Sequence, residues 1–534
     1  MSRSLIASLA TAALSLTLLH ASVRHVPGEY ATIQAALDAV QNDDTVLVAL
    51  ATYAEELSAP PRRFWLIGDV EIDTGIFARP VIDPSSLDSA RWRECVGVPA
   101  GCELTIERMA FVNHAAMYPR AEEVGSGGIM LNSAETLTLR YCTFDSVYHA
   151  ITSLDPQDTL QARVVIADCR FTNAQRCQVC PGWYERVEIR RSLFDGRHFW
   201  SHYIYAGDSS VLEDCTFKGD SINGVIVLEG QHGVIHNCVF GPMDSLTNPV
   251  IRGTDMTVEG NAFTGLRTNT NLLLVGWNEG DPVIINHNYF AHNGVWADNA
   301  WVGISVSQLG ESPAGFAALI DSNVFAFNAQ VSAAFPKAIW LDTRVSLTGN
   351  HFRALQPLNV PCIDSWSALP GTQLRFNQFE AGDYAIRNGS HPMDAILNYW
   401  GDPTGPYNAG SNPEGLGARI DDNIFFDPWS PDTTFLWSPR PRAPLPQSVS
   451  LEIFPNPFNA TATLKLVVTE PGIFQIDLFN LLGQHVQQIW SGAVAYEKQI
   501  AFDGKDLASG LYFVRVFQPV DNRVETLQKV VIAK

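Results

Sequence analysis

The sequence predicts an all-β protein in which a long solenoid of short strands is followed by a small β-sandwich. Two observations lead to this fold class. Aliphatic and phenylalanine residues recur together along most of the chain, and after a proline-rich segment the pattern changes to longer alternating strands. The composition agrees, since 46% of the 534 residues are hydrophobic and only 17% are charged, which is too apolar for a disordered chain or a coiled coil.

The first residues are typical of a secretory signal peptide. Arg3 precedes an uncharged apolar run over 5–19, and small residues follow at 21–22. We therefore assign 1–21 to a leader that is removed during export. The run is short for a membrane span and no later segment is apolar over 18 residues, so we expect no transmembrane segment in the mature chain.

The repeat has the form aliphatic-x-x-(Cys or Asn)-x-Phe, as in Leu212-Glu-Asp-Cys215-Thr-Phe217. An aliphatic residue stands five positions before each phenylalanine of the series. A unit of this length, with short strands and no helical period, predicts a solenoid coil that must stack on its neighbours to bury its inner face. The phenylalanines are Phe111, Phe144, Phe171, Phe194, Phe217, Phe240, Phe263, Phe290, Phe325, Phe352 and Phe379.

The position two before the phenylalanine is Cys at 142, 169, 215 and 238, and Asn at 261, 288, 323, 350 and 377. We expect these Asn side chains to bond their own backbone and the Asn of the next coil. We interpret the Cys residues as small buried hydrophobes, with metal or redox chemistry as the alternative. Cys177 and Cys180 have the spacing of half a zinc or redox site without a second pair. Cys95 and Cys102 are candidates for a local disulfide.

Two motifs frame the repeats. The first runs from Val26-Pro-Gly-Glu to Val40 and places Ile33, Ala36, Leu37 and Val40 on one apolar helical face. The second is Asn398-Tyr-Trp-Gly-Asp-Pro, with Phe426-Asp-Pro-Trp after it.

With the repeats, these motifs resemble the right-handed parallel β-helix (pectin-lyase-like) family over 24–430. The resemblance implies an N-terminal helix that caps the first coil, which otherwise exposes unpaired strand edges.

The end of the chain has its own organisation. A spacer over 431–448 is rich in proline, and 449–534 contains several short alternating strands that predict a β-sandwich. Phe454-Pro-Asn-Pro-Phe-Asn459, Leu478-Phe-Asn-Leu-Leu-Gly483 and Leu507-Ala-Ser-Gly510 resemble the C-terminal sorting domain of type IX secretion cargo. The resemblance implies that the type IX machinery is a partner, and that the protein is secreted or attached to the outer surface of a bacterial cell.

The charge limits the partners. With 35 basic and 56 acidic residues the formal net charge is −21, which argues against nucleic acid, since phosphate binding needs clustered Lys and Arg. The same charge repels polyuronates, so a neutral glycan fits better.

The sequence contains no complete catalytic motif of the enzymes known in the family that it resembles. Gln157-Asp-Thr-Leu160 matches part of a pectinesterase segment, yet no second segment follows, so we interpret it as a turn. Asp421 and Asp422 are the only nearby pair of acidic residues, and the other residues that polygalacturonases require do not accompany them. The sequence leaves open whether the protein is an enzyme, and a polysaccharide lyase or glycoside hydrolase is the class if it is one.

The weak catalytic candidates lie 14 to 17 residues after a repeat phenylalanine and are Asp208, Asp255, Glu279 and Asp342. No cofactor is evident, and calcium is the one metal kept open.

Aromatic residues give the best candidate for a binding surface. Trp277, Trp340 and Trp366 follow their repeat phenylalanines by 14 or 15 residues, which predicts one face of the solenoid. Exposed tryptophans offer stacking platforms to sugar rings, whereas buried ones only fill the core. Trp200, His202, Tyr203 and Tyr205 add a cluster on one coil. The predicted function is binding, with cleavage as an extension, of extracellular polysaccharide; the alternative is a non-catalytic structural or adhesive surface protein.

Overall fold

The structure is a computed structural model of the chain. The leader expected at 1–21 lies, except for Ala21, outside the described residues. The described residues are 21–69, 71–73, 76–87, 94–113, 127–131, 136–153, 163–173, 177–180, 186–196, 202–220, 226–228, 232–268, 270–278, 281–295, 303–308, 315–326, 338–353, 361–365, 369–380, 384–389, 391–434, 449–468, 472–480, 484–494, 497–518 and 523–534.

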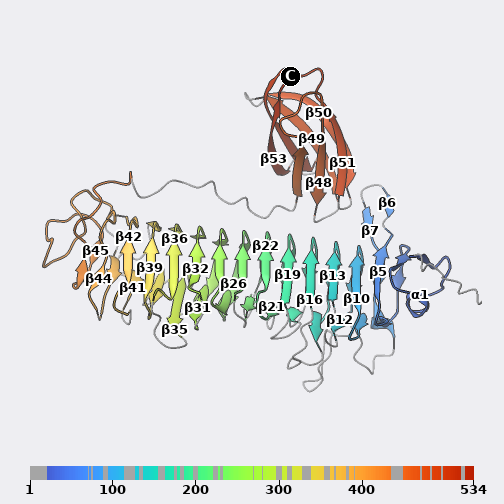
Figure 1. The fold of residues 1–534 in the computed structure, drawn as a ribbon, viewed down its shortest axis with the longest axis horizontal. Helices are drawn as coiled ribbons and strands as arrows, with labels where there is room; N and C mark the ends of the chain where they lie inside the picture. Colours follow the sequence, from blue (N-terminus) through green and yellow to red (C-terminus); the bar gives the residue numbers. More distant parts are fainter. Residues whose placement is uncertain are drawn as a thin grey trace, which may run out of the picture.

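Three long parallel sheets run along the solenoid (Figure 1), as the predicted fold class requires. Sheet A extends from β1 (Val23–Val26) to β46 (Ile424–Phe425). Sheet B extends from β3 (Thr52–Tyr53) to β40 (His351–Arg353), and sheet C from β4 (Leu57–Ser58) to β45 (Arg419–Ile420). Most coils contribute one strand to each sheet, so neighbours in a sheet are one coil apart in the chain.

One coil illustrates why the aliphatic residue and the phenylalanine are five positions apart. The chain passes from β19 (Arg186–Arg190) in sheet A to β20 (Leu193–Gly196) in sheet B through a two-residue bend. Arg191 in the bend has φ of 46°, and the bend residue of the next coil, Asp214, has φ of 54°. This left-handed conformation turns the chain sharply, so that residues on both sides of the bend point into the core.

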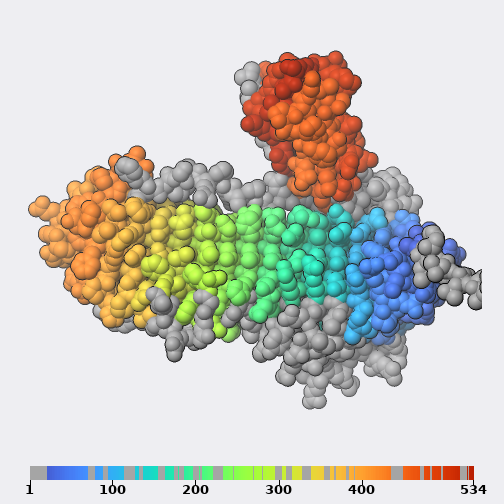
Figure 2. Space-filling view, viewed as in Figure 1, coloured from blue at the N-terminus to red at the C-terminus, as the bar shows by residue number. Residues whose placement is uncertain are grey.

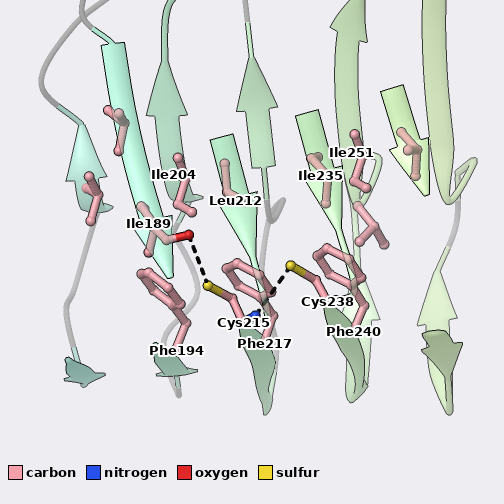
Figure 3. Close-up of a cluster of buried hydrophobic side chains, with 14 of the residues drawn as sticks. Ile189, Phe194, Ile204, Leu212, Cys215, Phe217, Ile235, Cys238, Phe240 and Ile251 are labelled. Carbon is pink, nitrogen blue, oxygen red and sulfur yellow. Dashed lines mark hydrogen bonds between the residues drawn. The ribbon is translucent and has the colours of Figure 1, made fainter. Parts of the chain in front are cut away.

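The inner face of sheet B is a continuous stack of aromatic rings. Phe194, Phe217 and Phe240 lie face to face in Figure 3, with ring centroids 4.8 Å and 4.9 Å apart and planes tilted by 13° or less. The stack runs from Phe111 to Phe379, and Trp400 closes it with its ring 5.0 Å from that of Phe379. Every ring of this series is buried, which confirms the repeat deduced from the sequence.

A second ladder follows the bend between sheets A and B. Asn288 donates from both its backbone nitrogen and its Nδ2 to Oδ1 of Asn323, at 2.9 and 3.0 Å. Its Nδ2 also donates to the carbonyl of Val258, one coil on the other side. The same bonds continue to Asn398, so each amide ties three coils together, as the sequence predicts.

Cysteine occupies the same ladder in earlier coils. The backbone nitrogen of Cys215 lies 3.4 Å from Sγ of Cys238, and Ser192 substitutes its Oγ for a sulfur at another rung. These thiols are buried and free. Packing and backbone contacts explain the ladder cysteines, so the alternative interpretation as metal or redox groups is not needed for them.

The possible disulfide between Cys95 and Cys102 does not form. Sγ of Cys95 lies 3.1 Å from the carbonyl of Gly127 in sheet C, whereas Cys102 immediately precedes β10 (Glu103–Glu107) of sheet A. The two thiols therefore belong to different sheets.

Helix α1 (Ile33–Ala39) covers the first coil, as the resemblance implies. Its buried residues are Ile33, Ala36 and Leu37, and Thr32 caps it by accepting from the nitrogen of Ala35. The carboxylate of Glu55 accepts from the nitrogens of Ile33 and Gln34, both at 2.9 Å. A negative group at a helix start satisfies otherwise unbonded N–H groups and holds the cap in place.

The last 86 residues contain two antiparallel sheets over one core, which agrees with the predicted β-sandwich. One sheet has the order β47 (Val449–Phe454), β48 (Thr461–Val468), β51 (Glu497–Asp503). The other has the order β50 (His485–Val494), β49 (Gly472–Asn480), β52 (Gly510–Gln518), β53 (Arg523–Ile532). We retain as a proposal the domain boundaries 24–430, 431–448 and 449–534.

We predict that Asn323→Ala lowers the free energy of unfolding by about 3 kcal/mol, because it removes the buried acceptor of two Asn288 donors and the donor to the carbonyl of Ile285. Denaturant unfolding followed by circular dichroism measures the loss. The control is Cys238→Ser, which we expect to cost less than about 1 kcal/mol, because Ser192 already serves in the ladder. An equal loss in both variants would contradict the special role of the amide.

Candidate functional site

Sheet C carries the candidate site, and its strands have an inner row of stacked aliphatic residues and an outer row that is buried in several coils. The inner residues Ile304, Ile339, Ile363 and Ile386 stack in register and are buried. The strands of this region are β27 (Ile251–Thr254), β31 (Leu273–Trp277), β35 (Ile304–Gln308), β38 (Ile339–Leu341), β41 (Pro361–Asp364) and β43 (Tyr384–Arg387). In Figure 1, β31 and β35 lie along the lower edge of the solenoid.

The residue after each inner residue faces outward, because side chains alternate along a strand. Register pairs join these residues into one row, which we call the outer column of sheet C. Its members differ from coil to coil in size, polarity and charge, unlike the uniform inner ladders. They are Arg252, Leu274, Ser305, Trp340, Asp364 and Arg387.

Several polar members of the outer column are buried although they face away from the core. Ser305 is 7% exposed, Asp364 is 0% exposed, and Trp340 is half-buried. On the outer face of sheet A, by contrast, the side chains of Arg140 and Arg190 are 55% and 50% exposed. Figure 2 shows the coils as successive bands of surface, so that each face of the solenoid combines a few residues from every coil. The outer face of sheet C is therefore a sheltered polar surface, which suits a binding site.

Asp342 belongs to the same surface, two positions beyond Trp340. Its backbone nitrogen donates a hydrogen bond to the carbonyl of Val306 in the preceding coil, at 3.5 Å. Burial raises the pKa of Asp342, and its Oδ1 is a buried atom without a hydrogen-bond partner in the described structure. The site thus holds a carboxyl group that favours its protonated form more than an exposed aspartate does.

Asp364 has the opposite environment. It forms an ion pair with Arg387, whose Nη2 donates to Oδ2 of Asp364. The hydrogen bond to Asp364 raises the pKa of Arg387. One surface therefore combines a protonation-prone carboxyl group with a carboxylate that has a permanent counter-ion.

The surface continues into the last coil. The guanidinium of Arg419 lies over the ring of Tyr384, 4.5 Å from its centroid, and the hydroxyl of Tyr384 donates to Asp421. Burial, followed by the bond to Asp421, raises the pKa of Tyr384. Asp421, one member of the acidic pair with Asp422, is thus a hydrogen-bond partner of Tyr384.

The equal spacing of the tryptophans from their phenylalanines does not translate into equal register. Trp340 is in register with Ser305, which is in register with Leu274 one coil earlier. Leu274 lies three positions before Trp277, which is in register with Gln308 instead. Both lie on sheet C and both are half-buried, but they do not form one column. Connections of different length between sheets B and C cause the shift.

The carboxylate candidates are also separated. Asp255 follows β27 and is three coils from Asp342, about 14 Å along the stack. Its Oδ1 accepts from the nitrogen of Asn278, so the residue shapes a turn. Asp208 is exposed, in the turn after β21 (His202–Ala206).

Other candidates are only partly described. Glu279, Trp200, Trp366 and the segment 157–160 lie outside the described residues. His202, Tyr203 and Tyr205 lie in β21, and Tyr205 shares the backbone register of Trp340 from five coils away, about 24 Å.

Asp364, Arg387, Ser305 and Arg252 were not predicted from the sequence. The signal that finds them is the outward residue directly after each isoleucine of sheet C, rather than the distance from the phenylalanine. Among the described residues, no group of three His, Cys, Asp or Glu side chains can hold a metal ion, so calcium stays a prediction. In those same ranges no helix is long and apolar enough to cross a membrane.

We predict opposite pH effects for two aspartates. The native pKa of Asp342 is raised, so its charge opposes folding above the unfolded pKa of about 4. Asp342→Asn should therefore be more stable than wild type at pH 7, and the difference should vanish as the pH falls below about 4.

For Asp44, burial opposes the charge, but hydrogen bonds from the Gln41 and Ser22 backbones and from Arg24 lower its pKa to about 2. Its contribution is present above pH 4 and is lost as the pH falls through 2, so Asp44→Asn should be less stable at pH 7. Urea midpoints between pH 4 and pH 7 check both signs, and a stabilised Asp44→Asn variant would contradict the reasoning.

Comparisons with known proteins address the two parts of the chain separately. Residues 127–244 match the family model of the right handed beta helix region, and residues 452–533 match that of the secretion system C-terminal sorting domain. No curated protein matches the chain. The sorting domain indicates export by type IX secretion, with release or attachment at the cell surface.

Solved structures that are similar to this chain include a GH136 lacto-N-biosidase from Eubacterium ramulus, at 10% identity and a TM-score of 0.26, over 67% of this chain and 62% of that one. The chain thus spans less than two thirds of that enzyme.

The tailspike protein gp49 of Acinetobacter baumannii bacteriophage Fri1, a capsular polysaccharide depolymerase, matches at 10% identity with a TM-score of 0.30. The match covers 96% of this chain and 82% of that one. The periplasmic alginate epimerase AlgG matches at 10% identity with a TM-score of 0.30, over 72% of this chain and 77% of that one. At such identities and TM-scores, nothing about this chain is concluded from these structures. The stacked coils, the capping helix and the two family matches together identify the chain as a right-handed parallel β-helix protein with a C-terminal sorting domain for type IX secretion.

Proposed function

We propose that the exported protein binds an extracellular polysaccharide on the outer face of sheet C. The observation that carries this proposal is the half-buried Trp340, which stands in register between Ser305 and Asp364. An indole ring offers an apolar platform to the face of a sugar ring, and hydroxyl and carboxylate groups beside it supply hydrogen bonds to sugar hydroxyls.

The shelter of this face supports the proposal. A polar side chain loses hydrogen bonds to water when it is buried, so a sheltered polar surface is costly unless it serves a ligand or a structural bond. Asp364 has such a bond with Arg387, and Asp342 retains an unbonded buried oxygen. Export through type IX secretion brings the surface into contact with material outside the cell.

Charge favours a neutral glycan. The net charge of −21 repels polyanions, and Arg387 is compensated by Asp364. Arg252, at the start of the outer column, is exposed and is a local exception that a weakly acidic glycan can use. We therefore expect neutral polysaccharides to be retained more strongly than polygalacturonate or alginate.

The test is affinity electrophoresis of the exported chain in gels that contain galactomannan, xylan, β-glucan, polygalacturonate or alginate. Trp340→Ala should weaken retention by the best glycan about tenfold, the loss expected for one stacking platform. The matched control is Trp65→Ala in β5 (Arg63–Gly68), which removes a half-buried tryptophan from the outer face of sheet A. Retention by no glycan, or equal loss in both variants, would leave the structural or adhesive alternative.

A further inference from the structure

We propose that cleavage of the Ala21–Ser22 bond creates an α-ammonium group that anchors the start of the solenoid on the buried carboxylate of Asp44. The proposal rests on the leader assigned to 1–21 and is independent of the polysaccharide site. Ala21 and Ser22 are exposed, and β1 begins directly after them. The bond therefore lies at the junction of leader and folded chain, between two small residues that suit a leader peptidase.

Ser22 already belongs to the first coil. Its carbonyl accepts from the backbone nitrogen of Thr45 at 2.9 Å, which extends the pairing of β1 with β2 (Asp44–Val48). Its backbone nitrogen and its Oγ both donate to Oδ1 of Asp44, each at 2.8 Å. Cleavage converts this nitrogen from an amide into an ammonium group, so the existing hydrogen bond becomes an ion pair.

The covalent step is a hydrolysis. Water adds its hydroxyl group to the carbonyl carbon of Ala21 and a hydrogen to the nitrogen of Ser22, and the bond between these two atoms breaks. The new carboxyl group of Ala21 releases a proton, and the new amine takes one up, since an α-amino group has an ordinary pKa of about 8. The leader peptidase of the export pathway is the enzyme required, and water is the co-reactant.

The carboxylate of Asp44 has one oxygen for each of two cations. Arg24 donates to Oδ2 from Nε at 2.9 Å and from Nη2 at 2.7 Å, and the nitrogen of Gln41 donates to the same oxygen at 2.8 Å. Oδ1 receives the Ser22 group. The side chain of Asp44 is 2% exposed, so a second counter-charge offsets the cost of keeping the carboxylate away from water.

The neighbouring charged and titratable groups have partners of their own. Arg24 also donates to the hydroxyl of Tyr30 at 2.7 Å, and Asp43 accepts from Arg63 of β5 at 2.6 and 2.9 Å. The new ammonium group touches the carboxylate of Asp44, whereas Arg24 lies on the far oxygen. The nearer charge dominates, so the pKa of the ammonium group rises above its ordinary value. Its stabilisation is present below about pH 8 and is lost as the pH rises through the raised native pKa.

The experiment begins with the intact mass of the exported chain, which should start at Ser22. The pKa of its α-amino group is then measured from the pH dependence of acylation, followed by mass spectrometry of the N-terminal peptide. We expect a pKa at least one unit above that of the unfolded chain, which makes acylation at pH 7 about tenfold slower. Asp44→Asn should restore the ordinary pKa. The matched control is Asp43→Asn, which alters the adjacent carboxylate and should leave the pKa raised.

A second variant keeps every side chain in place. One additional glycine before Ser22, left by removal of a fusion partner, displaces the same charge by about 3.5 Å. This chain should have an ordinary α-amino pKa, and amides in 23–48 should exchange hydrogen about tenfold faster than in the chain that starts at Ser22.

Each result decides the proposal. An exported chain that starts at another residue, or an ordinary α-amino pKa in the chain that starts at Ser22, overturns it. Equal hydrogen exchange with and without the additional glycine overturns the anchoring role. A raised pKa that Asp44→Asn and the glycine abolish, and that Asp43→Asn preserves, supports it.

Discussion

The interaction on which the structure depends is the stacking of equivalent residues between consecutive coils. Each ring of the phenylalanine series lies 4.7–5.0 Å from the next, and from Asn288 to Asn377 each ladder Asn accepts two hydrogen bonds from one neighbour while donating to the other. A coil cannot bury its inner face by itself, so these contacts are both the packing and the alignment of the solenoid. The sandwich at the end of the chain has a separate core.

Strict stacking inside permits variety outside. Because the inner ladders fix the spacing of the coils, an outward residue in one coil has a defined neighbour in the next, whatever its type. The outer column of sheet C uses this freedom to set an arginine, a serine, a tryptophan and an ion pair in a row. The outer face of sheet A uses it for exposed cross-coil ion pairs such as Arg163 with Glu188. Such pairs are worth little in stability but suit a solvated face.

The fold was predictable because its signal is repeated. The phenylalanines, the aliphatic residues five positions earlier and the Asn rungs all occupy the core, where packing tolerates few residue types. The site was only partly predictable. Asp342 and Trp340 were named from the sequence, whereas their neighbours Asp364 and Arg387 were not, because the distance from the phenylalanine to sheet C varies. Leu273 follows Phe263 by 10 residues, but Ile339 follows Phe325 by 14. Loop length costs little free energy, so insertions shift the count without disturbing the coils.

The outer column also bears on how a long polymer engages the protein. A surface that repeated one residue in every coil would offer a chain-like ligand many equivalent positions, and the ligand would slide along it in steps of one coil. Here Leu274, Ser305, Trp340 and Asp364 follow one another without repetition. In the proposed complex only one alignment sets a sugar ring on Trp340, so a bound chain would have a single registration point on a solenoid that is otherwise periodic.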